Sequence, residues 1–181
     1  MADRLALLGS RILGVDVGKK RVGISISDSN AKVATPHSIL ERKLALIQIK
    51  KIIDDYSINF VVVGIPLFGN NSIMMEASLI EQLATDGLEL NSENYYKVKE
   101  LLASAKDKKL NSLEDAVSFS IELIDNCPIR LYLHDEKFTT KIVQSAARSQ
   151  NISAKKQSGK LDDLAATVML QGFLDSLEVE T

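Results

Sequence analysis

Residues 12–28 read ILGVDVGKKRVGISISD, and this stretch is the basis for interpreting the rest of the chain. An apolar run ends close to Asp16, a glycine-containing turn with three basic residues follows, and a second, alternating run comes after it. The pattern predicts a β-hairpin over residues 12–17 and 22–27. A charged carboxylate in an apolar strand is costly to bury without a partner, which makes Asp16 a candidate functional residue. A basic side chain or a bound metal ion would supply that partner.

The length and composition of the chain indicate one soluble globular domain. Its 181 residues suffice for a single core, and 45% hydrophobic with 25% charged residues is ordinary for that class. The net charge of −2 excludes a general polyanion binder, so contact with nucleic acid requires a local basic patch. Cys127 is the only cysteine, which excludes an intrachain disulfide, and the apolar stretch at residues 5–8 is too short to span a membrane. We therefore expect a cytoplasmic protein with one domain, residues 1–181.

Behind the hairpin, the pattern predicts strands and helices in alternation. Residues 31–37 indicate a third strand that Pro36 ends, after a turn at residues 28–30. Residues 44–56 repeat apolar side chains at helical spacing. Residues 59–66 form an unbroken, largely β-branched run, which is typical of a strand buried on both faces of a sheet.

The second half of the chain continues this alternation. Ser112, followed three residues later by Asp115, has the spacing of a capping box and predicts the start of a helix. The predicted elements are that helix at residues 112–126, a strand at 129–134, a helix from Thr139 or Thr140 to about Arg148, a polar loop at 153–160 and a last helix at 162–177.

The stretch after the buried strand is the least regular part of the chain. Residues 68–111 contain two possible helices, at 73–84 and 95–105, around a polar and acidic segment at 86–94. We interpret this stretch as an inserted helical excursion or a mobile arm. The three-strand meander and the helix-linked strands around it predict an α/β fold, a mixed sheet with helices on its faces.

Three acidic residues stand where one predicted element meets the next: Asp16 ends the first strand, Glu136 follows the last strand and Asp162 begins the last helix. Ligand sites of open α/β sheets gather outside the carboxyl ends of strands. Three carboxylates there would repel one another, and Mg²⁺, which prefers carboxylate and water oxygens, removes that repulsion. Two such ions about 3.5–4 Å apart stabilise the attacking and the leaving oxygen of a phosphodiester displacement. The set therefore indicates hydrolysis of a nucleic-acid backbone.

Each of these acids also has a structural explanation when it is taken alone. Asp16 can be a turn or cap residue, and Glu136 beside Asp135 can mark the solvated exit of a strand. Asp162 or Asp163 can be an acid favoured by the dipole of a helix N-terminus. Only their combination favours a shared site.

A basic stretch lies between two of the three acids. Residues 137–160 contain no acidic residue, a pattern that suits salt-dependent phosphate binding but is also ordinary for a solvated face. Thr139 and Thr140 stand at a predicted helix start, where a hydroxyl can cap the helix or contact phosphate, and we favour capping for at least one of them. The candidate nucleic-acid-binding residues are Lys19, Lys20, Arg21, Lys137, Thr139, Thr140, Lys141, Arg148, Lys155, Lys156 and Lys160.

Other reactive side chains have weaker patterns. His37 and His134 lack metal-ligand spacing, and we interpret the strand residue His134 as structural. Cys127 has no base partner along the chain and suits a packed helix end. The hairpin glycines match neither GxGxxG nor a P-loop, which argues against nucleotide binding.

Four segments along the chain share one further pattern. Residues 14–23, GVDVGKKRVG, contain D-x-G-x-x-R-x-G, and residues 62–67, VVGIPL, are similar to V-V-G-L-P-L. Residues 135–140, DEKFTT, are similar to D-E-R-x-T-T. Residues 155–156, KK, and 162–171, DDLAATVMLQ, are similar to a closing K-K…D-x-L-A-A-x-x-[IL]-L-Q. In this order the segments resemble the YqgF/RuvX family, RNase H-like Holliday-junction resolvases also assigned to maturation of small-subunit ribosomal RNA.

The resemblance implies an RNase H-like fold and a metal-dependent nuclease. It implies Asp16, Glu136 and Asp162 as catalytic carboxylates that bind Mg²⁺ or Mn²⁺, while Asp163 falls at a variable position. The main departure from the family is the length of the chain before the helix at Ser112. We therefore expect a family-atypical insertion at about residues 69–111.

The expected substrate is the precursor of ribosomal RNA, cleaved at the 5′ end of the small-subunit RNA during ribosome biogenesis. One alternative is a Holliday junction resolvase that acts on branched DNA, and another is a non-catalytic RNA-binding assembly factor. Expected partners are structured RNA or branched DNA and pre-ribosomal particles, with the chain a monomer or a homodimer. An ATPase of the sugar-kinase or actin type shares the opening hairpin but needs two such domains, for which 181 residues are too few.

Overall fold

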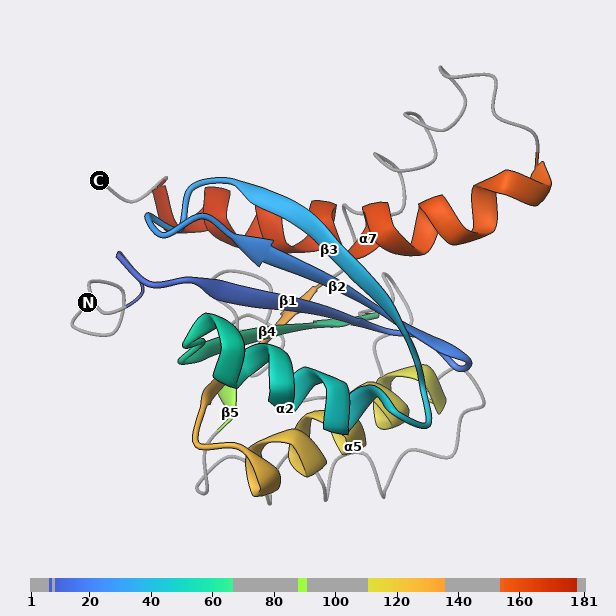
Figure 1. The fold of residues 1–181 in the computed structure, drawn as a ribbon, viewed down its shortest axis with the longest axis horizontal. Helices are drawn as coiled ribbons and strands as arrows, with labels where there is room; N and C mark the ends of the chain where they lie inside the picture. Colours follow the sequence, from blue (N-terminus) through green and yellow to red (C-terminus); the bar gives the residue numbers. More distant parts are fainter. Residues whose placement is uncertain (1–6, 8, 67–87, 91–110, 136–153, 179–181) are drawn as a thin grey trace, which may run out of the picture.

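The strands form one mixed sheet, with six strands described in the order β3-β2-β1-β4-β6-β5. Helix α7 covers one face, and α2 and α5 cover the other (Figure 1). This is the RNase H-like α/β arrangement that the sequence predicts, with one strand more. The computed structural model describes residues 7, 9–66, 88–90, 111–135 and 154–178, and gives the backbone alone for residues 88–90, 111, 154–163 and 178.

The predicted opening hairpin is confirmed. β1 (Ile12–Val17) and β2 (Arg21–Ser27) pair antiparallel, and Asp16 stands opposite Gly23. The Ser27 hydroxyl accepts a hydrogen bond from the Ile12 N–H at 2.8 Å, which joins the end of β2 to the start of β1.

The third strand, β3 (Ala34–Glu41), begins and ends later than predicted. Pro36 lies inside the strand, so the prediction that it ends the strand is wrong. β3 is an edge strand of the described sheet, and its register against β2 shifts between Ile24 and Ser25, where Pro36 pairs. An edge and a bulge are the places in a sheet that tolerate the missing N–H of proline.

Three parallel strands form the centre of the sheet. β1, β4 (Phe60–Ile65) and β6 (Arg130–Asp135) are parallel neighbours. The helices predicted before β4 and β6 are confirmed as α2 (Ala45–Tyr56) and α5 (Asn111–Asn126). Because the three strands run in one direction, their carboxyl ends meet at one side of the sheet, here named the carboxyl edge.

A short strand lies inside the predicted insertion. β5 (Leu88–Leu90) pairs antiparallel with β6 and extends the sheet, where the sequence predicts only a polar segment. Three residues are too few to show the alternation by which a strand is recognised, and pairing with β6 is a tertiary contact. The helices predicted at residues 73–84, at 95–105 and from Thr139 or Thr140 to about Arg148 lie outside the described residues.

The last helix is longer than predicted. α7 (Ala154–Glu178) already includes residues 154–160, so the prediction of a loop there is wrong. Alanine, lysine and glutamine in that stretch are strong helix formers, and their polar character does not imply a loop. Among the described residues, no helix is both long and apolar enough to cross a lipid bilayer.

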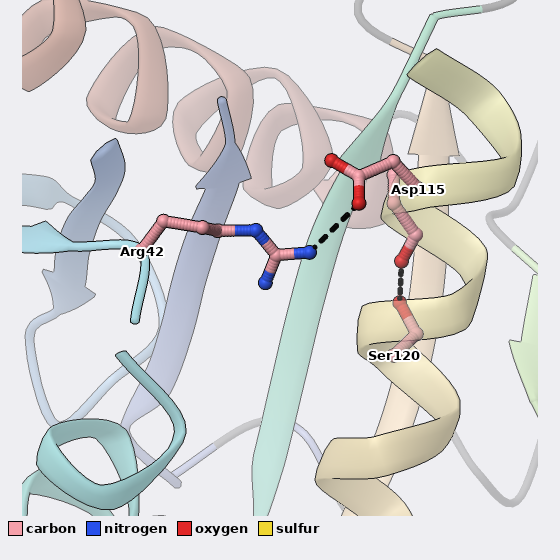
Figure 2. Close-up of polar contacts among 4 residues, drawn as sticks. Arg42, Asp115 and Ser120 are labelled. Atoms are coloured by element: carbon pink, nitrogen blue, oxygen red, sulfur yellow. Dashed lines mark hydrogen bonds and ion pairs between the residues drawn. The ribbon is translucent and has the colours of Figure 1, made fainter. Parts of the chain in front are cut away.

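The face covered by α2 and α5 holds the larger apolar cluster of the described residues. Phe119 of α5 is fully buried there, and the guanidinium carbon of Arg42 lies 4.3 Å from its ring centre. Arg42 Nη2 also donates to Asp115 Oδ1 at 2.9 Å (Figure 2). The described bond of Asp115 is therefore the one to Arg42, and not the capping bond that its spacing from Ser112 predicts.

Cys127 is buried directly after α5, and burial raises the pKa of its thiol, as expected of a packed residue.

Along the hairpin, small residues line the face of the sheet that α7 covers. The large apolar residues of β2 belong to the cluster under α2 and α5, while Gly23, Ser25 and Ser27 alternate with them and face α7. Both serines are buried. Small side chains on this face allow the helix to approach the sheet closely.

Candidate active site

Asp16 lies at the carboxyl edge, one residue before the end of β1, and its side chain is partly buried. Ile12 packs in the same cluster as residues of α7, and a Cβ on Gly14 would lie 2.8 Å from Leu170 Cβ of α7. Residues two apart on a strand share a face, so Asp16 also faces α7. The carboxylate therefore stands where the α7 face meets the carboxyl edge.

The register of the parallel strands brings the end of β6 to the same edge. Continuing the β1–β4–β6 register by one residue puts Asp16, Gly64 and His134 in one row. Neighbouring strands lie about 4.8 Å apart, which separates the outer two backbones of this row by roughly 10 Å. β6 ends at Asp135, so Glu136 is the next residue of the chain, and its own placement lies outside the described residues.

Helix α7 leads the position of Asp162 toward the carboxyl edge. Its Ala166 carbonyl accepts a hydrogen bond from Ser25 Oγ at 2.9 Å, and Leu170 lies over Gly14. Positions 162, 166 and 170 share one face of a helix, and 162 is one turn nearer the helix start. α7 starts on the side of the β1–β2 turn and ends on the side where β1 begins (Figure 1). The backbone thus directs position 162 toward the end of β1, while the side chain of Asp162 is outside the described set.

The place of Asp162 within α7 removes one structural explanation for this acid. Stabilisation by the helix dipole is confined to the first turn. α7 begins at Ala154, so Asp162 and Asp163 both lie beyond that turn. The interpretation of either as a helix N-terminal acid is wrong, and so is the prediction that Asp162 begins the helix.

The β1–β2 turn presents the first basic cluster near Asp16. Lys19, Lys20 and Arg21 are exposed, and the Gly18 N–H donates to the Arg21 carbonyl at 3.0 Å to close the turn. A Cβ on Gly18 would lie 2.8 Å from that carbonyl oxygen, which is too close for any other residue without a shift. The turn therefore holds three cations next to the carboxyl edge.

The second predicted basic cluster is described in part. Lys155, Lys156 and Lys160 belong to the first turns of α7. The other predicted phosphate-binding residues lie outside the described part of the chain, namely Lys137, Thr139, Thr140, Lys141 and Arg148.

His134 is the residue at this edge whose setting the sequence did not indicate. Its Nδ1 is buried without a hydrogen-bond partner in the described part of the chain, and its ring stands edge-on to Phe173 of α7, with centroids 5.6 Å apart. Burial lowers the pKa of His134 to about 4, so the imidazole is neutral near pH 7. Buried polar atoms are rarely left without a partner. The alternation of the strand, which puts His134 on the face of Tyr132, is the signal that could have indicated this setting.

The donors that a metal ion would need at this edge are described only in part. Among the described side chains, no group of three or more His, Cys, Asp or Glu residues could hold a metal ion. Asp16 is the one predicted ligand whose side chain belongs to the described set. A partly buried carboxylate at a strand end is the hard oxygen donor that Mg²⁺ prefers, so this residue fits the expected ion.

The chain belongs to the family described as RuvX: Holliday junction resolvase, whose sequence profile matches residues 10–115 and 101–176. This confirms the resemblance found in the four sequence segments. A Roseiflexus protein named "Putative pre-16S rRNA nuclease" is 28% identical over 169 residues, covering 92% of this chain and 94% of its own. A protein of the same name from Anaplasma marginale is 32% identical over 169 residues, covering 91% and 84%.

Among solved structures, T. thermophilus RuvC in complex with a Holliday junction substrate overlaps this chain with a TM-score of 0.48. The overlap covers 94% of this chain and 97% of that one, at 12% identity. The family assignment rests on the sequence match alone.

Proposed function

We propose that this protein is a metal-dependent nuclease that hydrolyses phosphodiester bonds in a ribosomal RNA precursor. The family match supports a nucleic-acid substrate, and the names of the curated relatives support ribosomal RNA. The observation that carries the proposal is the position of Asp16, a partly buried carboxylate on the α7 face of the carboxyl edge. Both β6 and α7 lead toward this edge, and they carry the chain to the other two predicted acids.

In this proposal Asp16, Glu136 and Asp162 hold Mg²⁺ or Mn²⁺. Such an ion, when bound, lowers the pKa of water and stabilises charge on the leaving oxygen. β1 holds Asp16 in place because it is paired on both sides, with β2 and with β4. The exposed cations at residues 19–21 bind phosphates of the incoming strand, which makes affinity fall as salt rises.

Branched DNA is the second candidate substrate, because the family description names a Holliday junction resolvase. Side-by-side cleavage of precursor ribosomal RNA and of a four-way DNA junction, with the full chain and Mg²⁺ or Mn²⁺, compares the two. Faster cleavage of the RNA is expected. Faster cleavage of the junction would replace the first candidate by the second.

The decisive variant is Asp16→Asn, which keeps the shape of the side chain and removes its charge. We expect cleavage to fall by at least about 100-fold, the scale on which loss of one electrostatic contact to a reacting group is felt. The variant is expected to stay folded, because asparagine has nearly the same shape as aspartate, and thermal unfolding measures this.

Asp28→Asn is the matched control, an aspartate at the end of the neighbouring strand with a structural role. Its Oδ1 accepts backbone hydrogen bonds from Lys32 at 2.6 Å and Val33 at 2.9 Å, and bonds of this kind, led by that from Val33, lower the pKa of Asp28. We expect this variant to melt earlier and to cleave normally. If Asp16→Asn behaves like Asp28→Asn, Asp16 is a turn residue. If the wild type and Asp16→Asn are equally inert while both bind RNA, the protein is a non-catalytic binding factor.

A further inference from the structure

A close contact between α7 and the sheet lies a few residues along the chain from two of the predicted metal ligands. Ser25 is fully buried, and its hydroxyl donates to the carbonyl of Ala166 in the middle of α7 at 2.9 Å. These residues are 141 positions apart in the sequence. The bond therefore joins the opening hairpin to the last helix.

Gly14, the partner of Ser25 across the hairpin, leaves room for this bond. A Cβ on Gly14 would collide with Ser25 Oγ and would lie 2.8 Å from Leu170 Cβ, closer than real Cβ atoms come. Apolar surfaces can slide with little loss of contact, whereas a hydrogen bond weakens steeply when its atoms are displaced. Together, the hydrogen bond and the missing side chain fix both the height and the register of α7 over β1.

Both predicted ligands lie on the carboxyl-edge side of this contact. Asp16 is two residues beyond Gly14 on β1, or about 6.6 Å at 3.3 Å per residue. Asp162 is four residues before Ala166 on α7, or about 6 Å at 1.5 Å per residue. Strand and helix run in opposite directions, so both offsets lead toward the carboxyl edge (Figure 1). The contact therefore sets the spacing between the two positions.

We propose that Ser25 is a positioning residue, whose hydrogen bond to α7 sets the distance between Asp16 and Asp162 and thereby the affinity of the metal site. The inference rests on the proposed function, because it requires those two carboxylates to share an ion. Ser25 is fully buried, so in this proposal it binds neither the ion nor the substrate. Its effect passes through α7 alone.

The test compares Ser25→Ala with Ser120→Ala. Ser120 is a matched control, because it is also fully buried and its hydroxyl donates to the carbonyl of Ala116 at 2.8 Å (Figure 2). That bond lies within α5, on the opposite face of the sheet, and it joins α5 to no other element. Both variants remove one buried hydroxyl and one hydrogen bond to an alanine carbonyl.

The measurements are Mn²⁺ binding by isothermal titration calorimetry and thermal unfolding without metal, both on the full chain. Ser25→Ala is expected to weaken Mn²⁺ binding by about 10-fold, as changes that misplace metal ligands do. Ser120→Ala is expected to change it less than about twofold, while both variants lower the unfolding midpoint by roughly 2–4 °C. Ser25→Cys keeps a weak donor and is expected to bind Mn²⁺ with intermediate affinity, so it replaces Ser25→Ala if that variant does not fold.

Equal Mn²⁺ affinities of the Ser25 and Ser120 variants would overturn the inference and leave the proposed function intact. Asp16→Asn separates the two hypotheses, because it is expected to abolish Mn²⁺ binding. If the wild type does not bind Mn²⁺, or if Asp16→Asn binds it normally, both the proposed metal site and the inference are wrong.

Discussion

Both faces of the sheet carry an apolar cluster, and the two faces differ in what the opening hairpin presents to the helices. Under α2 and α5, large aliphatic side chains of the strands pack with Phe119, and this layer is the larger described core. Under α7, the hairpin offers Gly14 and Ser25, with the partly buried Asp16 and the buried His134 Nδ1 near the edge. Apolar burial stabilises without direction, while close backbone approach and hydrogen bonds fix positions. Along the hairpin, the first face therefore chiefly contributes apolar burial, and the second chiefly fixes the position of α7.

The substitution with the largest expected effect removes a buried side chain from the face covered by α2 and α5. Phe119→Ala should lower the free energy of unfolding by about 3–5 kcal/mol, because it leaves a cavity under Arg42. Urea unfolding measures this loss, and Ile47→Ala, at a side chain that is 72% exposed on α2, should change it by less than about 0.5 kcal/mol. Cleavage per folded molecule should stay at the wild-type rate. A loss of cleavage in Phe119→Ala that is still folded would show that packing under α2 and α5 also controls the site on the α7 face.

The substitution with the next largest expected effect adds one methyl group to the face covered by α7. Gly14→Ala should cost up to about 3 kcal/mol, because the new Cβ collides with Ser25 Oγ and crowds Leu170. In Gly14→Ala/Ser25→Ala one of these collisions is relieved, so the double variant should lose less than the sum of the single losses, by at least about 0.5 kcal/mol. Urea unfolding of all four proteins measures this coupling. Additive losses would show that the two residues do not share the contact.

A smaller effect concerns the pH dependence of stability. Burial holds the pKa of His134 at about 4, below the ordinary value of 6.5, so the unfolded chain binds the proton more tightly. Stability is therefore complete above pH 6.5 and is lost as the pH falls toward 4. Between pH 7 and pH 5 this residue should account for a loss of about 2 kcal/mol, which His134→Phe should remove.

Urea unfolding at both pH values tests this expectation, with His37→Phe, at an exposed histidine, as the control. His37→Phe should keep the loss of stability that His134 causes between pH 7 and pH 5. The same slope in His134→Phe and the wild type would show that the α7 face is not sensitive to acid through this residue.

Much of the fold could be predicted because it depends on local pattern. The alternation of residues 22–27 and the β-branched run before Pro66 gave β2 and β4 correctly. Pro36 misled the prediction of β3, since whether a proline ends a strand depends on the strand's place in the sheet. β5 exists through its pairing with β6, which no local pattern contains.

The candidate site was predicted as a set of residue types and could not be predicted as a geometry. The sequence indicates Asp16 as an anomalous carboxylate, and the structure puts it at the carboxyl edge. The role of Ser25 depends on a partner 141 residues away, so no window of sequence could reveal it. The setting of His134 depends in the same way on Phe173 of α7.

The position of Pro36 has a consequence for how the protein meets other chains. An unprotected edge strand offers a row of N–H and C=O groups to any extended peptide. On β3, the imino nitrogen of Pro36 and the shift in register opposite Ser25 interrupt that row. Continuous pairing of a strand from another molecule along β3, an edge of the described sheet, is therefore interrupted at Pro36. The proline thus shortens the stretch of backbone that this edge offers to an extended peptide.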